Sequence, residues 1–133
     1  MVTPFNILTP GNIRFGRGQA RSAAPWLAQY DAPVLLVHGA TKSRAQFLLS
    51  ELTALHLQVS TFAIANEPTL DDIERGVRLA RELGVGAVVS LGGGAVIDAG
   101  KAIAALVPAS GPAIDYLEVV GTGRILEASP LPF

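Results

Sequence analysis

The sequence predicts an α/β fold, with a mainly parallel sheet and flanking helices, on three observations. Short continuous apolar runs, such as residues 34–37, are typical of strands that are covered on both faces. Segments with helical spacing alternate with these runs, and such alternation implies right-handed crossovers between parallel strands. A glycine triplet then separates the mainly apolar run of residues 87–90 from a further helical segment. Strand, glycine turn and helix start are together typical of a phosphate-binding loop in a Rossmann-like domain.

The amino-terminal residues predict a β-hairpin followed by a helix. Two β-prone runs, residues 5–8 and 12–15, flank a turn signal at residues 9–11. Residues from about 19 to 30 have a helical pattern, in which Pro25 marks a first turn or a break. The hairpin would leave an exposed edge ribbon, and we expect a homo-oligomer to pair through it.

Residues 34–37 and 59–64 predict the first two parallel strands, and residues 43–55 the helix between them. That helix places four apolar side chains on one face, which are Phe47, Leu48, Leu52 and Leu55.

The helix predicted over residues 69–83 has signals at both ends. Thr69 is a favourable N-cap residue, and Asp71 and Asp72 stand in the first turn, where the helix dipole favours acids. Gly84 follows the last turn, in the usual position of a helix-ending glycine.

The glycine triplet consists of Gly92, Gly93 and Gly94. Without side chains, its backbone can adopt positive φ and let an anion approach the N–H groups. The helix that begins near Ala95 would direct unpaired N–H donors and its positive dipole end at that anion, and a pyrophosphate fits this description. The alternative is a tight turn without a ligand, since the spacing differs from G-x-G-x-x-G.

Two charged residues, Asp98 and Lys101, stand in the first two turns of the same helix. They are candidates for a role in the same anion-binding site. The alternative is an exposed ion pair at i, i+3.

Three loops are predicted to meet at one rim, because ligands of parallel sheets bind beyond the carboxyl ends of the strands. Gly39 follows the first strand, Asn66 and Pro68 follow the second, and the glycine triplet follows the third. His38, beside Gly39, is interpreted as a rim residue that is hydrogen-bonded to backbone, and the alternative is a contact with the ligand.

Composition limits the classes of function. The 133 residues fit one domain, residues 1–133, and 10 Lys and Arg against 11 Asp and Glu argue against a nucleic-acid partner. The absence of Cys excludes disulfides and thiolate metal sites. No signal peptide or membrane-spanning run is apparent, so we expect a soluble, cytoplasmic protein without a membrane partner.

Residues 92–104 resemble the glycine-rich signature G-G-G-S-x-x-D-x-x-K of the iron-containing (group III) alcohol dehydrogenases. Residues 13–18 resemble that family's segment I-x-F-G-x-G, residues 34–39 its second strand, and residues 66–69 its helix entry x-x-P-T. Ala95 stands where the family has Ser, so one hydroxyl contact to phosphate is missing while the backbone contacts are retained.

The resemblance implies a dinucleotide cofactor, NAD or NADP, and hydride transfer between it and a small alcohol or aldehyde. It also implies that Gly93 and Gly94 contact the pyrophosphate, that Asp98 contacts the ribose on the nicotinamide side, and that Lys101 lies near ribose or phosphate. The family's metal, iron or zinc, is held by an Asp and three His of its carboxyl-terminal half. We therefore expect no metal ligands in this chain and no turnover by it alone.

Gly39 bears on the choice of cofactor. In the family that the chain resembles, an Asp at the position of Gly39 binds the adenosine ribose and repels a 2′-phosphate, whereas a Gly leaves room for that phosphate. Lys42 and Arg44 follow closely and are candidates to pair with that phosphate. The alternative is that Gly39 only makes the turn and both cations are solvated, so both NADP and NAD are carried forward.

Residues 108–133 have a weaker pattern and an apolar end. Since the resembling family continues into another strand and a helical domain, we expect a dinucleotide-binding domain truncated before the metal-binding domain. Glycerol dehydrogenases and dehydroquinate synthases, with zinc as the usual metal, share this type of domain, and maleylacetate reductases need no metal. A different alternative is a stand-alone nucleotide-binding or regulatory module without catalysis.

Overall fold

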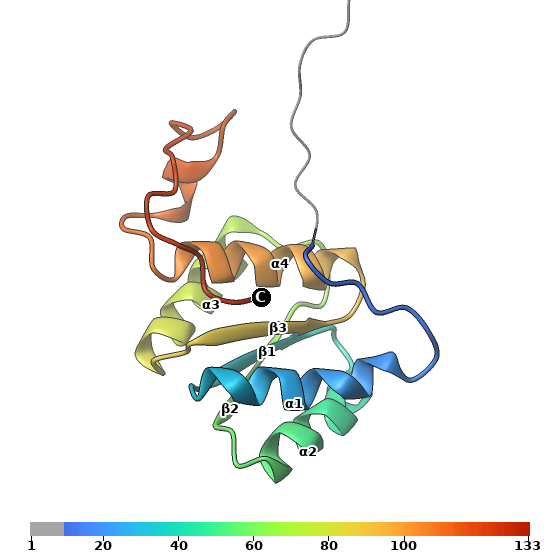
Figure 1. Cartoon of the computed structure of the whole chain (residues 1–133). Coiled ribbons are helices and arrows are strands. Elements are labelled where there is room, and N and C mark those ends of the chain that lie inside the picture. The colour runs from blue at the N-terminus through green and yellow to red at the C-terminus, as the bar shows by residue number, and fades with distance from the viewer. Residues whose placement is uncertain (1–9) are drawn as a thin grey trace, which may run out of the picture.

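The computed structural model describes residues 10–133 and contains a three-stranded parallel sheet (Figure 1). The strands are β1 (Val34–His38), β2 (Val59–Ala63) and β3 (Ala87–Leu91), in the order β2-β1-β3. Val34 pairs with Val59 on one side and with Ala87 on the other. The predicted parallel α/β architecture is therefore confirmed.

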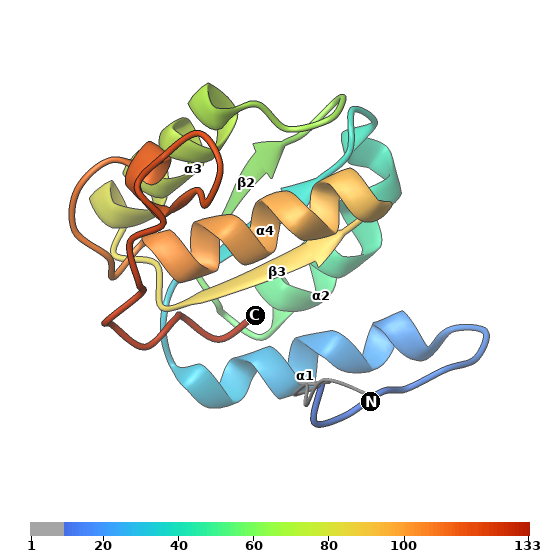
Figure 2. The same cartoon turned by 90° about the horizontal axis from the view of Figure 1, so that it is seen from above.

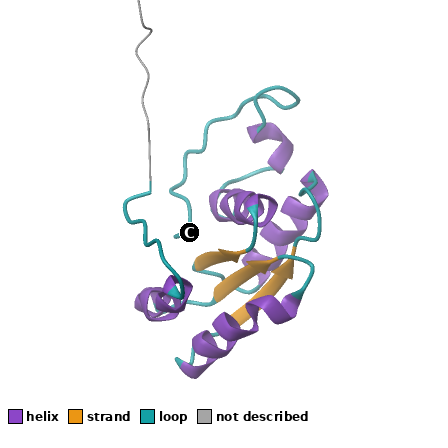
Figure 3. Ribbon diagram, turned by 90° about the vertical axis from the view of Figure 1, so that its right-hand side faces the viewer, coloured by secondary structure: helices purple, strands orange, loops and turns teal. Residues whose placement is uncertain are grey.

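Helices cover both faces of the sheet (Figure 3). One face carries α1 (Ala23–Leu27) and α2 (Gln46–Ala54), and the other carries α3 (Leu70–Glu82) and α4 (Gly94–Leu106). Four short 3₁₀ turns complete the described secondary structure: η1 (Gln19–Ser22), η2 (Ala28–Tyr30), η3 (Lys42–Ala45) and η4 (Ala113–Tyr116).

The central strand β1 is buried along its whole length. Val34 and Leu36 pack among the α1 and α2 side chains, while Leu35 and Val37 pack among those of α3 and α4. Successive strand residues point to opposite faces, so a strand between two helical layers needs apolar residues at every position. This explains the uninterrupted apolar run in the sequence.

The predicted cap of α3 is present as a reciprocal pair of hydrogen bonds. The Asp72 N–H donates to Thr69 Oγ1 over 3.2 Å, and the Thr69 N–H donates to Asp72 Oδ2 over 3.0 Å. At the other end, Gly84 has φ 62°, the left-handed conformation that glycine adopts without strain. Both predicted helix signals are confirmed.

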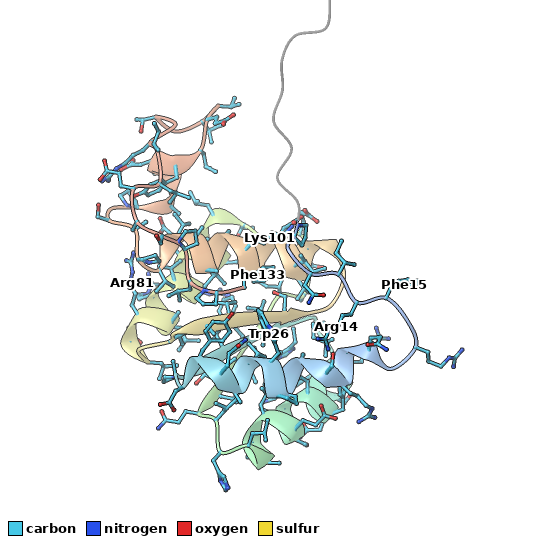
Figure 4. All side chains as sticks on the ribbon, viewed as in Figure 1. Arg14, Phe15, Trp26, Arg81, Lys101 and Phe133 are labelled. Atoms are coloured by element: carbon cyan, nitrogen blue, oxygen red, sulfur yellow. The ribbon has the colours of Figure 1, made fainter. Side chains whose placement is uncertain are left out.

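Two contacts fix α4 against α3. A Cβ on Gly76 of α3 would overlap the buried side chain of Ile103 on α4, so glycine permits the close approach of the two helices. Arg81, at the end of α3, donates to the carbonyl oxygens of Val107 (2.9 Å), Leu106 (2.8 Å) and Ala109 (2.5 Å), and thereby caps α4 (Figure 4).

The carboxyl-terminal residues lie beside the free edge of β3 (Figure 2). The Val88 N–H donates to the carbonyl oxygen of Pro132 over 2.9 Å, and the Leu131 N–H donates to that of Ala104 over 2.9 Å. None of the helices formed by residues 10–133 has the length and apolar content that crossing a membrane requires.

The amino-terminal hairpin is the main difference from the predicted fold. Residues 12–15 form no strand, and Ile13 and Phe15 are 76% and 99% exposed (Figure 4). Their β propensity finds no partner strand within residues 10–133, and an unpaired strand is not stable. The other half of the hairpin, residues 5–8, lies outside the described residues, and oligomerisation through this segment stays a prediction.

Asp72→Asn should make the folding stability less dependent on acid pH. The Thr69 N–H and hydroxyl hold the pKa of the Asp72 carboxyl below its ordinary value of 3.8, and Arg75 adds a smaller lowering. A carboxyl whose pKa is lowered in the folded state stabilises the fold at pH values above 3.8. This stabilisation is lost as the pH falls through the folded-state pKa.

Urea unfolding at about pH 7 and about pH 3 measures this dependence. The loss of stability between them should be smaller in Asp72→Asn than in the parent chain. Asp71→Asn is the matched control, because Asp71 is exposed and lies 3.7 Å from Arg75 without a role in the cap. An identical loss in all three proteins would contradict the assignment.

Candidate functional site

A cavity of about 450 Å³ lies at the carboxyl ends of β1 and β3. Two loops form most of its wall, namely residues 38–41 after β1 and residues 91–93 after β3, where the strand leads into α4 (Figure 2). The start of the helical segment after β1 completes the wall with Arg44, Ala45 and Phe47. The parallel arrangement of the strands brings these loops together at the predicted rim.

The structure thus brings Gly39, Gly92 and Gly93 to one cavity. Asn66 and Pro68 follow β2, which lies on the side of β1 away from β3, and neither of them lines the cavity. Two of the three predicted loops therefore meet here, and the third lies beyond them at the edge of the sheet.

The glycine triplet has a different backbone conformation from the one expected. None of its residues has a positive φ, and Gly93 is extended, with φ −80° and ψ −171°. The expectation of positive φ is wrong, because the chain passes from strand to helix through ordinary extended and helical conformations. Backbone conformation therefore does not require glycine at these three positions, and only the space around each residue can.

Packing explains only the first glycine of the triplet. A Cβ on Gly92 would lie 2.7 Å from Cγ2 of Val96, closer than real side chains approach. Apart from its chain neighbours and the adjacent helix backbone, a Cβ on Gly93 or Gly94 would meet no described atom within 4 Å. Nothing in residues 10–133 therefore requires glycine at positions 93 and 94, and both leave open space above the first turn of α4.

The first turn of α4 carries free backbone donors. Gly93 caps the helix without a side-chain bond, and its carbonyl accepts from Val96 and Ile97 over 3.1 Å each. Within residues 10–133, the N–H groups of Gly94 and Ala95 make no hydrogen bond. Helix N-termini with free N–H groups bind anions through these donors and the positive end of the helix dipole.

Asp98 and Lys101 lie on the outer face of α4. Their side chains are 65% and 60% exposed, and Nζ of Lys101 lies 3.6 Å from Oδ1 of Asp98. They form the exposed i, i+3 pair that the sequence allowed as an alternative. An exposed pair of this kind contributes little to stability, so both side chains are free to reorient.

The two histidines are far from equivalent. His38 is 4% exposed, and its Nδ1 lies 2.6 Å from the carbonyl oxygen of Gly39, as expected for a rim residue bonded to backbone. His56 is exposed and follows the C-cap of α2, with φ 61°. Within residues 10–133 no three His, Cys, Asp or Glu side chains come together, so the described residues do not fit a metal centre.

Thr41 and Phe47 are cavity residues that sequence reasoning missed. Phe47 was assigned only to the buried face of its helix, but it is half-buried and borders the cavity. The Arg21 guanidinium lies 5.4 Å from the centre of its ring and also pairs with Glu51 over 2.9 Å. Only one sequence signal could have placed Thr41 and Phe47 at the cavity, namely that the next helix begins a few residues after Gly39.

Comparisons with known proteins identify the family to which the chain is similar. The model of the family "Iron-containing alcohol dehydrogenase" matches residues 10–133. The chain is 29% identical over 134 residues to the probable NADH-dependent butanol dehydrogenase 2 of Bacillus subtilis, covering 97% of this chain and 33% of that protein. It is 32% identical over 126 residues to the NADPH-dependent aldehyde reductase YqhD of Escherichia coli, covering 92% and 30%.

The fold agrees with that of a solved structure, the NADH-dependent butanol dehydrogenase A of Thermotoga maritima. The TM-score is 0.80 at 23% identity, and the match covers 97% of this chain and 33% of that one. The chain thus spans about a third of the length of the relatives that it matches.

Valine substitutions should separate the two kinds of glycine in the triplet. Gly92→Val should lower the free energy of unfolding by roughly 1–3 kcal/mol, because its side chain overlaps Val96. Gly93→Val should lower it by less, about 1 kcal/mol or below, because valine is a poorer N-cap residue than glycine but its Cβ has open space there. Urea unfolding of both variants measures this, and equal destabilisation would show that position 93 is not open.

Proposed function

The chain belongs to the family of iron-containing alcohol dehydrogenases, and from this membership we propose that it binds NAD or NADP as the cofactor-binding part of an oxidoreductase. The proposed reaction is hydride transfer between the cofactor and an alcohol or aldehyde. The chain spans about a third of its relatives' length. The reaction and the substrate class therefore belong to this proposal and are not observations on the chain.

The observation that carries the proposal is the open first turn of α4. Gly93 and Gly94 leave space that no described side chain fills, and the free N–H groups of Gly94 and Ala95 border it. The turn begins a 13-residue helix beside a cavity of about 450 Å³. A pyrophosphate supplies the negative oxygens that such donors bind, and the attached nucleoside occupies the cavity.

Each proposed contact follows from its position. The N–H groups of the glycine turn donate to the pyrophosphate, while the Gly39 loop faces the adenosine ribose. Asp98 and Lys101, which share only a weak exposed pair, turn towards the ribose and phosphate on the nicotinamide side. Asn66 and Pro68 are proposed as contacts at the neighbouring strand end, outside the cavity.

A bound dinucleotide supplies the hydride acceptor or donor, and this chain's residues bind and orient it. The described residues bring no metal-ligand cluster together. We therefore propose that residues 1–133 alone bind the cofactor without steady turnover, and steady alcohol oxidation by the purified chain would contradict this.

We propose in addition that NADP is accepted at Gly39. A Cβ at this position would lie 3.9 Å from Val96 Cγ2, an ordinary contact, and Gly39 has no positive φ. Glycine is therefore not required by the fold, and its absent side chain leaves room for a 2′-phosphate. Arg44, whose side chain makes no ion pair within residues 10–133, borders the same cavity and is the proposed cationic partner.

Gly93→Val should abolish dinucleotide binding while the fold is retained. The valine side chain occupies the space that the pyrophosphate needs, while its Cβ meets no atom of a non-neighbouring residue within 4 Å. Calorimetric titration with NADP and NAD should show binding of at least one by the parent chain and none by the variant. Gly11→Val is the matched control, because Gly11 is exposed and equally open. Unchanged affinity in a folded Gly93→Val protein would refute the proposed site.

Gly39→Asp should shift the preference from NADP towards NAD. The new carboxylate can accept hydrogen bonds from the ribose hydroxyls of NAD, whereas beside a 2′-phosphate it places like charges together. The ratio of NADP to NAD affinity should fall at least about tenfold, which corresponds to roughly 1.4 kcal/mol.

Gly39→Asn is the matched control for this change, because it has nearly the same shape without the charge. Its affinity ratio should change less than that of Gly39→Asp. An unaltered ratio in Gly39→Asp would mean that Gly39 does not face the adenosine ribose.

A further inference from the structure

Ser90 connects the last part of β3 to the first turn of α4. Its side chain lies on the same face of the strand as Val88, towards α4, because alternate strand residues point to the same side. Its hydroxyl donates to the carbonyl oxygen of Val96 over 3.1 Å. Val96 is the third residue of α4, so this bond reaches the turn that carries the free N–H groups.

The surrounding contacts leave this bond little freedom. A Cβ on Gly100, one turn further along α4, would overlap the Ser90 hydroxyl, so the helix lies directly against the strand there. The side chain of Val96 packs so closely against Gly92 that a Cβ on Gly92 would lie 2.7 Å from Val96 Cγ2. Val96 is thus held through its carbonyl by Ser90 and through its side chain by Gly92.

Hydroxyls elsewhere in the sheet are not used in this way. Ser60 is also half-buried and lies on β2, yet its side chain makes no hydrogen bond within residues 10–133. The bond of Ser90 is therefore particular to the strand that leads into the glycine turn.

We propose that Ser90 is a positioning residue that sets the direction of the Gly94 and Ala95 N–H groups towards the bound pyrophosphate. The inference rests on the proposed function, because it assigns a role within that same anion site. Ser90 does not contact the ligand. It acts through the Val96 carbonyl, and small displacements of hydrogen-bond donors are enough to weaken a bound anion.

The test uses the 133-residue chain and follows the backbone amide signals of Gly94 and Ala95 by NMR. Inorganic pyrophosphate and NADP are titrated separately into the parent chain, Ser90→Ala, Ser90→Thr and Ser60→Ala. Thermal unfolding of each protein is measured in parallel. Ser90→Thr retains a hydroxyl donor, and Ser60→Ala makes the same chemical change on a strand that does not lead into the site.

Ser90→Ala should weaken both ligands at least about threefold, whereas Ser60→Ala should leave both dissociation constants within about twofold. Ser90→Thr, where it keeps the parent's thermal stability, should restore affinity to near that of the parent chain, because it retains the hydroxyl donor.

Parent affinity in folded Ser90→Ala would overturn the inference and leave the proposed function intact. Equal weakening in Ser90→Ala and in a Ser90→Thr protein that keeps the parent's thermal stability would also overturn it, because the hydroxyl would then not be responsible. If neither ligand shifts the Gly94 and Ala95 signals in the parent chain, the proposed function fails and the inference fails with it.

Discussion

The burial of β1 between two helical layers is the constraint on which the rest of the structure depends. All five residues of this strand are buried, and its backbone is paired on both sides by β2 and β3. Parallel pairing requires that each connection return over a face of the sheet, so α2 and α3 must lie where they do. The same connections bring the carboxyl ends of β1 and β3 to one rim. The position of the candidate site is thus a consequence of how the core is covered.

Glycines in the triplet meet two different demands that look identical in a sequence. Gly92 is small because Val96 packs against it, whereas Gly93 and Gly94 are small although nothing in the described chain occupies their surroundings. The first demand is internal to the fold, and the second is the one that the proposed cofactor site would explain. The sequence does not distinguish the two cases, because the difference lies in which atoms surround the position of a Cβ. Ser90 and Gly100 extend the internal demand to the next turn of α4.

Elements with local signals were predictable from the sequence. The Thr69 and Asp72 cap, the Gly84 end of α3 and the three strands all follow from residues a few positions apart. Features that depend on distant partners were not predictable. Arg81 caps a helix about 25 positions away, and Thr41 and Phe47 border the cavity only because two loops converge. The strand expected at residues 12–15 fails for the same reason, since β propensity does not supply a partner.

The pairing of the carboxyl-terminal residues with β3 affects how the molecule behaves at high concentration. An exposed strand edge offers free N–H and C=O groups to other chains, and this promotes aggregation. Here Pro132 places its carbonyl against the Val88 N–H, and as a proline it has no N–H to offer in return. With Pro130 two residues earlier, the covering segment accepts from β3 but is a poor template for a further strand. Pro132 therefore occupies one donor of this edge without offering a donor of its own to a further strand.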